Sequence, residues 1–145
     1  MILALDTDVL VTWAMEGAPK HRVVRRFIEE EVRDRGSQVG LVPQVLLEFL
    51  HVCTDPRRFE QPLSMDQGVQ VVRELWDAKE VSRVAQAPII VHRTLELLTQ
   101  LGLGRKRLLD TALAATLEAA AIRRFATLNA RDYRVFPFLE LVTPA

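Results

Sequence analysis

Three short, largely apolar runs, separated by segments with a helical pattern, constrain the fold of this chain more than any other feature. They read "ILAL" at residues 2–5, "QVGLV" at 38–42 and "RFATL" at 124–128. Apolar runs of this length are typical of strands buried on both faces, as in parallel sheets. Two weaker runs, at 81–85 and 139–142, are further candidate strands.

Helices are predicted between these strands, and their boundaries carry characteristic residues. Pro19, Pro43 and Pro88 stand where helices should start, a position that tolerates proline. Ser64 is placed to cap another helix. The predicted helices cover residues 9–16, 20–35, 44–54, 65–79, 89–102 and 108–124, and residues 103–107 and 129–138 are expected to be loops.

The alternation of strands and helices implies right-handed crossovers between parallel strands. We therefore predict an α/β fold, with a central parallel sheet of about four to five strands and helices on both faces. A chain of 145 residues suits one domain, 1–145, with a substantial core.

Composition narrows the possible functions and locations. Acidic and basic residues number 19 each, so bulk attraction to nucleic acid is not indicated. The one cysteine, Cys53, excludes an internal disulfide and fits a reducing compartment. No apolar stretch approaches the roughly 20 residues that cross a bilayer. We expect a soluble, cytoplasmic protein that does not enter a membrane.

Acidic side chains gather where the predicted strands end. In an open parallel sheet, ligands bind beyond the carboxyl ends of the strands. Asp6 closes the first strand and Asp8 follows it, while Asp110 opens the helix that leads into 124–128. The other candidates for this edge of the sheet are Glu48, in the helix after the second strand, and Asn129 and Asp132, after strand 124–128.

Each of these carboxylates also has an ordinary structural explanation. Asp8 can cap a helix that starts at Val9. Asp110 in a first helical turn is favoured by the helix dipole. Glu48 can lie on the exposed edge of an amphipathic helix. Taken together, however, carboxylates that converge on one cleft repel each other unless a cation is present. An oxygen-only set without cysteine or paired histidine favours Mg²⁺ or Mn²⁺ over zinc.

Four segments, in this order, carry a family resemblance: "LALDTDVLV", "VPQVLLEFL", "LGLGRKRLLDTALAAT" and "FATLNARDYRVFPFLELVTP". The first resembles a D-T-N/S-x-L pattern, and the last resembles a closing T-x-N/D-x-x-D-F pattern. With these motifs the sequence resembles the PIN-domain ribonucleases, and most closely the VapC-type toxins of VapBC toxin–antitoxin modules. The resemblance covers nearly the whole chain and implies a single PIN-like domain.

The resemblance implies a set of site residues. Asp6, Glu48 and Asp110 match the three acidic metal-binding positions of the family. The fourth, more variable position falls on Asn129, or less closely on Asp132. Asparagine supplies no charge, so the number of ions held is open.

Three further positions fall near the implied metal site. Asp8 stands where the family has Asn or Ser, and we hypothesise that it replaces the charge missing at Asn129. Thr7 and Thr127 match small hydroxyl positions that line the family's site, although they can also be ordinary hydrogen-bonding residues at strand ends.

The implied activity is metal-dependent hydrolysis of RNA phosphodiester bonds by an endoribonuclease. The ion would activate a water and offset the charge that develops on the phosphate. Arg105, Lys106 and Arg107 precede Asp110 and can hold the RNA backbone, or they can form a solvated loop. We expect Arg123 and Arg124 to be surface charges.

The resemblance also implies protein partners. VapC-type proteins form homodimers and bind a small antitoxin. The apolar stretches Val9–Trp13 and Val45–Val52 are the candidates for that contact.

Two alternatives remain. "ILALDTDVL" also resembles the hhhhDxDx[TV] motif of haloacid-dehalogenase-like phosphatases, but Leu10 occupies the Thr/Val position and no later Gly-Asp-x-x-x-Asp pattern follows. The other alternative is a PIN-fold binding module that does not cut RNA. Metal binding would discriminate, because a pure scaffold gains nothing from concentrated carboxylates.

Overall fold

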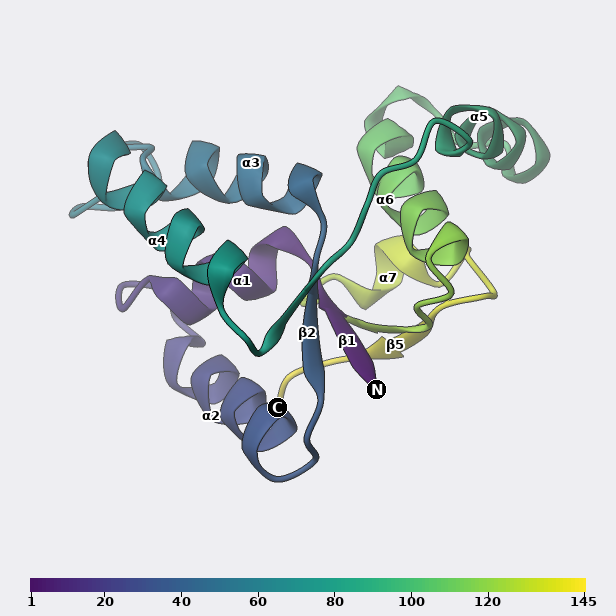
Figure 1. The fold of residues 1–145 in the computed structure, drawn as a ribbon. Helices are drawn as coiled ribbons and strands as arrows, with labels where there is room; N and C mark the ends of the chain where they lie inside the picture. The colour runs from purple at the N-terminus through teal and green to yellow at the C-terminus, as the bar shows by residue number, and fades with distance from the viewer.

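Five strands form a parallel sheet in the structure, a computed structural model that describes residues 1–145 (Figure 1). The order across the sheet is β3-β2-β1-β4-β5. The prediction of a central parallel sheet of about four to five strands is confirmed, since the sheet has five. The strands are β1 (Ile2–Leu5), β2 (Gln38–Leu41), β3 (Val81–Arg83), β4 (Arg124–Ala126) and β5 (Glu140–Val142).

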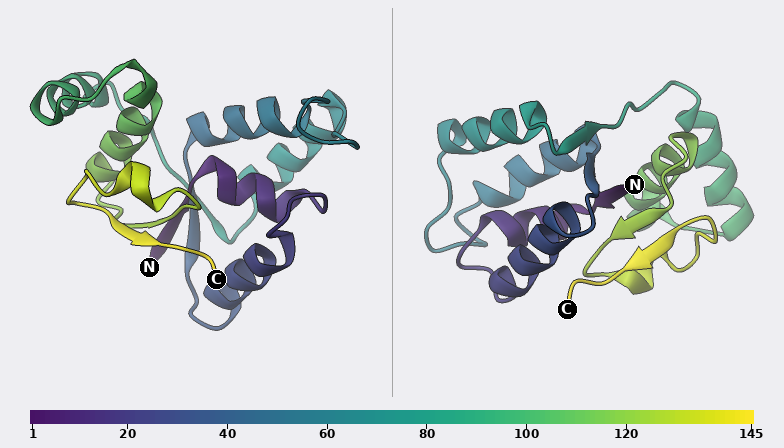
Figure 2. Two further views of the ribbon diagram at one scale, coloured as in Figure 1. Left: turned by 180° about the vertical axis from the view of Figure 1, so that it is seen from behind. Right: turned by 60° about the horizontal axis from the view of Figure 1, so that its bottom comes forward.

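Helices cover both faces of this sheet, as Figures 1 and 2 show. None of them combines the length and apolar character needed to cross a membrane. One side carries α1 (Thr7–Ala14), α2 (His21–Arg33), α3 (Pro43–Cys53) and α4 (Met65–Asp77). The other side carries α5 (Ile90–Leu101), α6 (Leu108–Ala119) and α7 (Ala130–Tyr133), and a 3₁₀ turn, η1 (Arg105–Arg107), precedes α6.

The strand order determines where a ligand can bind. The chain runs from β1 outward to β2 and β3, and it then returns to add β4 and β5 on the other side of β1. The direction of winding therefore switches between β1 and β4. The Asp6 N–H donates to the carbonyl of Ala126 at 2.9 Å, so the carboxyl ends of these two strands lie together. Such a switch point is the usual place for a binding crevice.

The apolar runs of the sequence form the centre of the core. Leu3, Leu5 and Phe125 are buried, as continuous apolar strands between two helical layers require. β1 and β2 approach closely at Gly40, where an added Cβ would lie 2.8 Å from Ile2 Cγ2. A side chain at that position would require the Ile2 side chain to shift.

Some predicted boundaries are wrong. The first helix begins at Thr7 rather than Val9, and its N-cap is Asp6, whose side chain accepts from the Thr7 N–H. Asp8 therefore lies within the first turn and does not cap the helix. The helix predicted to end at Arg124 ends at Ala119.

Two segments predicted as loops contain short helices, η1 and α7. Both are too short for a hydrophobic period to appear in the sequence.

Candidate metal and phosphodiester site

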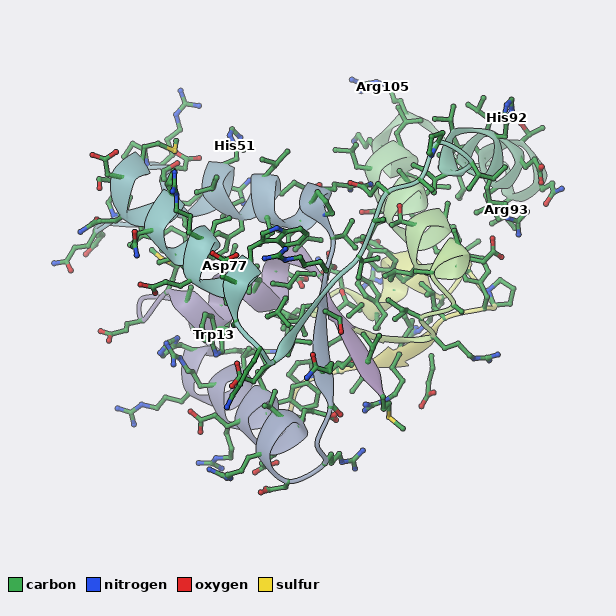
Figure 3. The ribbon with its side chains drawn as sticks, viewed as in Figure 1. Trp13, His51, Asp77, His92, Arg93 and Arg105 are labelled. Carbon is green, nitrogen blue, oxygen red and sulfur yellow. The ribbon has the colours of Figure 1, made fainter.

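A cavity of about 520 Å³ opens at the carboxyl edge of the sheet, where β1 and β4 end. Acidic side chains from four helices and the end of β1 line it, and no histidine or cysteine does. His51 and His92 lie on the outer sides of α3 and α5, away from each other (Figure 3). The polar lining includes Asp6, Asp8, Glu48, Asp110, Asn129 and Asp132, together with Thr7 and Tyr133.

Asp6 is the most buried of these carboxylates, with an exposed fraction of 8%. Its Oδ1 accepts from the Thr7 N–H at 2.8 Å, and its Oδ2 accepts from the Thr127 hydroxyl at 2.7 Å. Burial, and after it the charge of Asp8, raises the pKa of Asp6 to about 7. The carboxylate that ends β1 is therefore held by neutral donors alone, and its negative charge is costly.

Asp8 faces Asp6 from the first turn of α1. Its carboxylate accepts from the Leu128 N–H at 3.2 Å and from the Asn129 side-chain amide at 3.3 Å. Burial raises the pKa of Asp8. Asn129 thus turns its amide nitrogen, which cannot bind a cation, toward Asp8, while Asp132 adds another charge on this side of the cavity.

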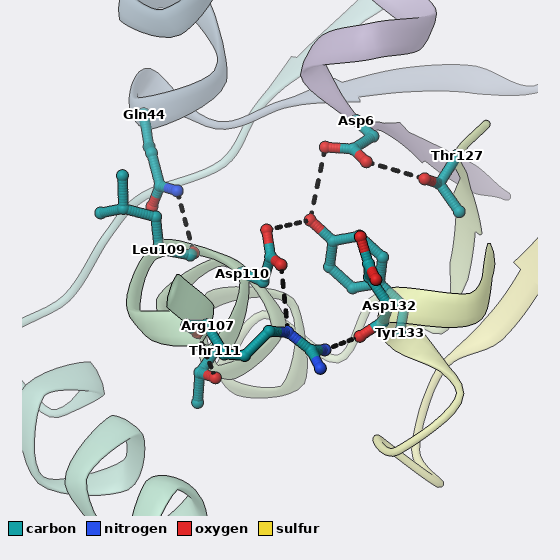
Figure 4. A network of polar contacts seen from close by, with 9 residues as sticks. All are labelled: Asp6, Gln44, Arg107, Leu109, Asp110, Thr111, Thr127, Asp132 and Tyr133. Carbon is teal, nitrogen blue, oxygen red and sulfur yellow. Dashed lines mark hydrogen bonds and ion pairs between the residues drawn. The ribbon is translucent and has the colours of Figure 1, made fainter. Parts of the chain in front are cut away.

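Asp110 reaches the cavity from the first turn of α6, and two side chains hold it (Figure 4). The Tyr133 hydroxyl donates to Asp110 Oδ1 at 3.1 Å, and Arg107 Nε lies 3.4 Å from Oδ2. Burial raises the pKa of Asp110, and these two neighbours oppose that shift. Burial also raises the pKa of the Tyr133 hydroxyl, which therefore keeps its proton and acts as a donor.

Glu48 enters the cavity from the second turn of α3. The Thr7 hydroxyl donates to Glu48 Oε2 at 3.0 Å, and the Gln44 amide donates to Oε1 at 3.1 Å. The same Gln44 nitrogen donates to the carbonyl of Leu109 at 3.0 Å (Figure 4). Gln44 therefore ties the helix of Glu48 to the helix of Asp110, and the sequence alone gave no indication of this link.

The three basic residues before Asp110 have different surroundings. Arg105 and Lys106 are exposed and do not line the cavity, and Arg105 points outward (Figure 3). Arg107 is half-buried and also donates to the backbone carbonyl of Asp132. Two residues that sequence reasoning missed, Arg58 and Phe59, line the cavity from the segment between α3 and α4.

The donor set fits a hard divalent cation. The lining acids supply only oxygen, and burial raises the pKa values of Asp6, Asp8 and Asp110, so their ionised forms are costly without a nearby cation. No three acidic, histidine or cysteine side chains lie close enough to hold one ion directly. This arrangement is compatible with Mg²⁺, which is usually bound through one or two carboxylates and keeps several waters.

Comparison with known proteins identifies similar folds and sequences. No family model matches the chain. It is 24% identical to Ribonuclease VapC24 of Mycobacterium tuberculosis over 99% of this chain and 97% of that protein. VapBC2 from Rickettsia felis, solved bound to a promoter DNA fragment, has a TM-score of 0.67 at 18% identity, covering 99% and 98% of the chains. M. tuberculosis VapC20, a sarcin-ricin loop cleaving toxin, has a TM-score of 0.66 at 14% identity, covering 86% and 87%.

The fold and its neighbours define the class of this protein: the chain has the PIN-domain fold. Within that class, the resemblance to the VapC-type ribonucleases, which the sequence motifs indicated, is confirmed by the match to VapC24 along nearly the whole chain.

Proposed function

We propose that this protein is a Mg²⁺- or Mn²⁺-dependent endoribonuclease and the toxin of a type II toxin–antitoxin system. The observation that carries the proposal is the oxygen-only cavity at the switch point of the sheet, in which three carboxyl groups have raised pKa values. Buried carboxylates with no cation to balance them cost free energy, which a bound divalent ion would offset. The likeness to VapC24 supports ribonuclease chemistry for that ion.

In this proposal Asp6, Glu48 and Asp110 surround the ion, with at most two of them binding it directly and the rest through its waters, and Asp8 supplies additional charge. A bound divalent ion supplies Lewis-acid activation of water and neutralises phosphate charge. Thr7 orients Glu48 through the hydrogen bond to its Oε2.

Hydrogen bonds support roles for the remaining groups. Thr127 would orient Asp6 through the hydrogen bond to its Oδ2. Asn129 would hold Asp8 through its side-chain amide, and Asp132, which also lines the cavity, would be the acidic candidate for the fourth position.

RNA would reach this cavity past the ring of Phe59 and past exposed basic side chains. Arg58 has a side chain that is 61% exposed and lies next to Phe59, so a phosphate and a base could both be contacted there. Arg105 and Lys106 are free to hold the backbone farther out. Arg107, by contrast, is engaged by Asp110 and by the carbonyl of Asp132, so it holds the site together.

An antitoxin would dock on an apolar groove that includes part of one stretch expected from the sequence. Val9–Trp13 is largely buried, whereas Val45–Val52 exposes Leu47 and His51. A cavity of about 500 Å³ lies among α1, α2 and α4, and its walls include Leu10 and Trp13 of the first stretch, together with Ile28, Val71 and Leu75. The VapBC2 likeness supports a protein partner of this kind.

A homodimer would use a different surface. α5 and the start of α6 expose large apolar side chains, which a second copy of the chain could cover. They are Ile89, Val91, Leu95, Leu108 and Leu109.

The proposed activity is tested by incubating the purified protein with total RNA in Mg²⁺, in Mn²⁺ and in EDTA. We expect discrete, metal-dependent fragments that disappear with the double substitution Asp6→Asn/Asp110→Asn. Fragments that persist in this variant would contradict the assignment of the site. Absence of both cleavage and Mn²⁺ binding would favour the binding module, and hydrolysis of a small phosphomonoester instead would favour a phosphatase.

A further inference from the structure

The Tyr133 hydroxyl lies between two of the carboxylates assigned to the metal. It donates to Asp110 Oδ1 at 3.1 Å and lies 3.4 Å from Asp6 Oδ1 (Figure 4). The same hydroxyl thus contacts one oxygen of each carboxylate. The closing motif that this sequence resembles ends in phenylalanine, whereas this chain has tyrosine at that position.

The ring that carries this hydroxyl is fixed by the core. Tyr133 is 2% exposed, and it packs edge-on against Phe125 with ring centroids 4.8 Å apart and an interplanar angle of 69°. Phe136 lies on another side, with centroids 6.2 Å apart. Because the aromatic contacts determine the position of the ring, the position of the hydroxyl is also determined.

Asp110 therefore interacts with two side chains that differ in charge. Arg107 lies next to Asp110 Oδ2, and its positive charge partly offsets the negative charge of Asp110, which a cation site needs. The hydroxyl of Tyr133 is neutral, so it orients Asp110 Oδ1 without neutralising it. Asp6 and Asp110 repel each other, and a neutral hydroxyl between them favours the orientation in which both of these oxygens face it.

We propose that Tyr133 is a positioning residue, whose hydroxyl holds Asp6 and Asp110 in the orientation in which they jointly bind a divalent cation. The proposal rests on the proposed function, because it takes these two carboxylates as metal-binding groups. Groups that hydrogen-bond to metal ligands fix their orientation, and their loss commonly weakens metal affinity 10- to 100-fold.

The first test is Mn²⁺ binding to the full chain, measured by isothermal titration calorimetry. We expect Tyr133→Phe to weaken the affinity about tenfold, while the ring keeps its aromatic contacts. The matched control is Thr94→Val, which removes a partly buried hydroxyl, one that donates to the Ile90 carbonyl within α5, a helix that does not line the cavity. This control should bind Mn²⁺ like the wild type. Near-ultraviolet circular dichroism in EDTA checks that both variants retain their packing.

A second test needs no substitution, because Tyr133 is the one tyrosine of the chain. Ultraviolet resonance Raman bands of tyrosine respond to the hydrogen bonding of the hydroxyl. Addition of Mg²⁺ to the wild type should shift them, since the carboxylates that the hydroxyl contacts would change partners. Unchanged bands at saturating Mg²⁺ would contradict the proposal.

The outcomes separate this inference from the proposed function. If the wild type binds Mn²⁺ and Tyr133→Phe binds it equally well or more tightly, the positioning role is overturned and the proposed function stands. If the wild type does not bind Mn²⁺ at all, both are overturned. A tenfold loss confined to Tyr133→Phe supports both.

Discussion

Each end of the sheet buries an acidic side chain, and the pKa values of these two side chains are shifted in opposite directions. Glu31 is 4% exposed near the amino ends of the strands, and Asp6 is 8% exposed at the carboxyl ends. The Arg124 guanidinium donates to both Glu31 oxygens, at 2.8 and 3.0 Å, and the Ser37 hydroxyl adds a bond at 2.9 Å. These contacts, led by Arg124, hold the pKa of Glu31 below its usual value.

Asp6 has hydrogen-bond donors as well, but none of them is charged. It faces Asp8 and Asp110, and its pKa is raised to about 7 instead of being lowered. The two carboxyl groups thus have opposite pKa shifts, because burial is the largest cause at Asp6 and the hydrogen bonds of Arg124 are the largest cause at Glu31. The amino edge carries a completed ion pair, whereas the carboxyl edge lacks the positive charge that a bound metal ion would supply.

The largest expected effect comes from breaking the pair at the amino edge. Arg124→Ala leaves Glu31 with only Arg35 as a cation, an exposed side chain whose Nη1 lies 3.8 Å from Oε1. This should lower the free energy of unfolding by about 3 kcal/mol. Urea denaturation measures the change. The double substitution Glu31→Leu/Arg124→Met should recover most of the loss, because both charges are then gone. Mn²⁺ affinity of the folded variant should be unchanged, and a large loss of affinity would contradict the separation of the two edges.

The next effect is the dependence of stability on pH in EDTA. The folded-state pKa of Asp6 lies above its unfolded value, so the folded state binds more protons between about pH 4 and 7. Stability should therefore fall as pH rises, by about 2 kcal/mol between pH 5.5 and 7.5, since the slope approaches roughly 1.4 kcal/mol per pH unit while only the folded state is protonated. Glu31 has the opposite shift, so its contribution is lost only as pH falls below the usual carboxylate range.

Asp6→Asn is the control for that pH dependence. Unfolding curves at pH 5.5 and 7.5 should show a smaller difference for this variant than for the wild type. An equal difference would mean that another group is responsible.

A smaller change, Asp8→Asn, tests the additional carboxylate of the carboxyl edge. The variant keeps an oxygen to accept from the Leu128 N–H but removes one negative charge. We expect Mn²⁺ affinity to fall about tenfold, which corresponds to roughly 1.4 kcal/mol. Calorimetric titration measures it, and unchanged affinity would mean that Asp8 does not replace the charge missing at Asn129.

The smallest effect is expected at an exposed ion pair that belongs to neither edge. Arg83 Nη2 lies 2.7 Å from Asp77 Oδ1, and the side chains are 55% and 71% exposed (Figure 3). Asp77→Asn should change the free energy of unfolding by less than about 0.5 kcal/mol, because water screens such pairs. If Asp77→Asn lowered the free energy of unfolding as much as Arg124→Ala, the distance within an ion pair, rather than its burial, would determine its contribution to stability.

The sequence by itself determined the architecture and the edge at which the acidic residues gather. Short apolar runs alternate with segments that have a helical pattern, and these local patterns are sufficient to predict a parallel sheet between helices. Asp6 directly follows β1, and Asp110 lies in the first turn of the helix that leads into β4. Both positions fall near the carboxyl edge, because parallel strands end there and the helices that connect them begin there. Their roles as metal-binding groups remain predictions.

Tertiary structure alone decided the partners of the charged side chains. Arg124 was expected at the surface, yet it lies in a buried pair with Glu31, 93 positions away in the chain. The hydroxyl of Tyr133 reaches Asp110 and Asp6 across 23 and 127 positions, from a four-residue helix that no periodicity revealed. Local patterns record which face of an element is apolar. The packing of elements that are distant in the sequence determines which charged side chains meet. It therefore also determines whether a buried carboxylate has a basic partner or is available to bind a cation.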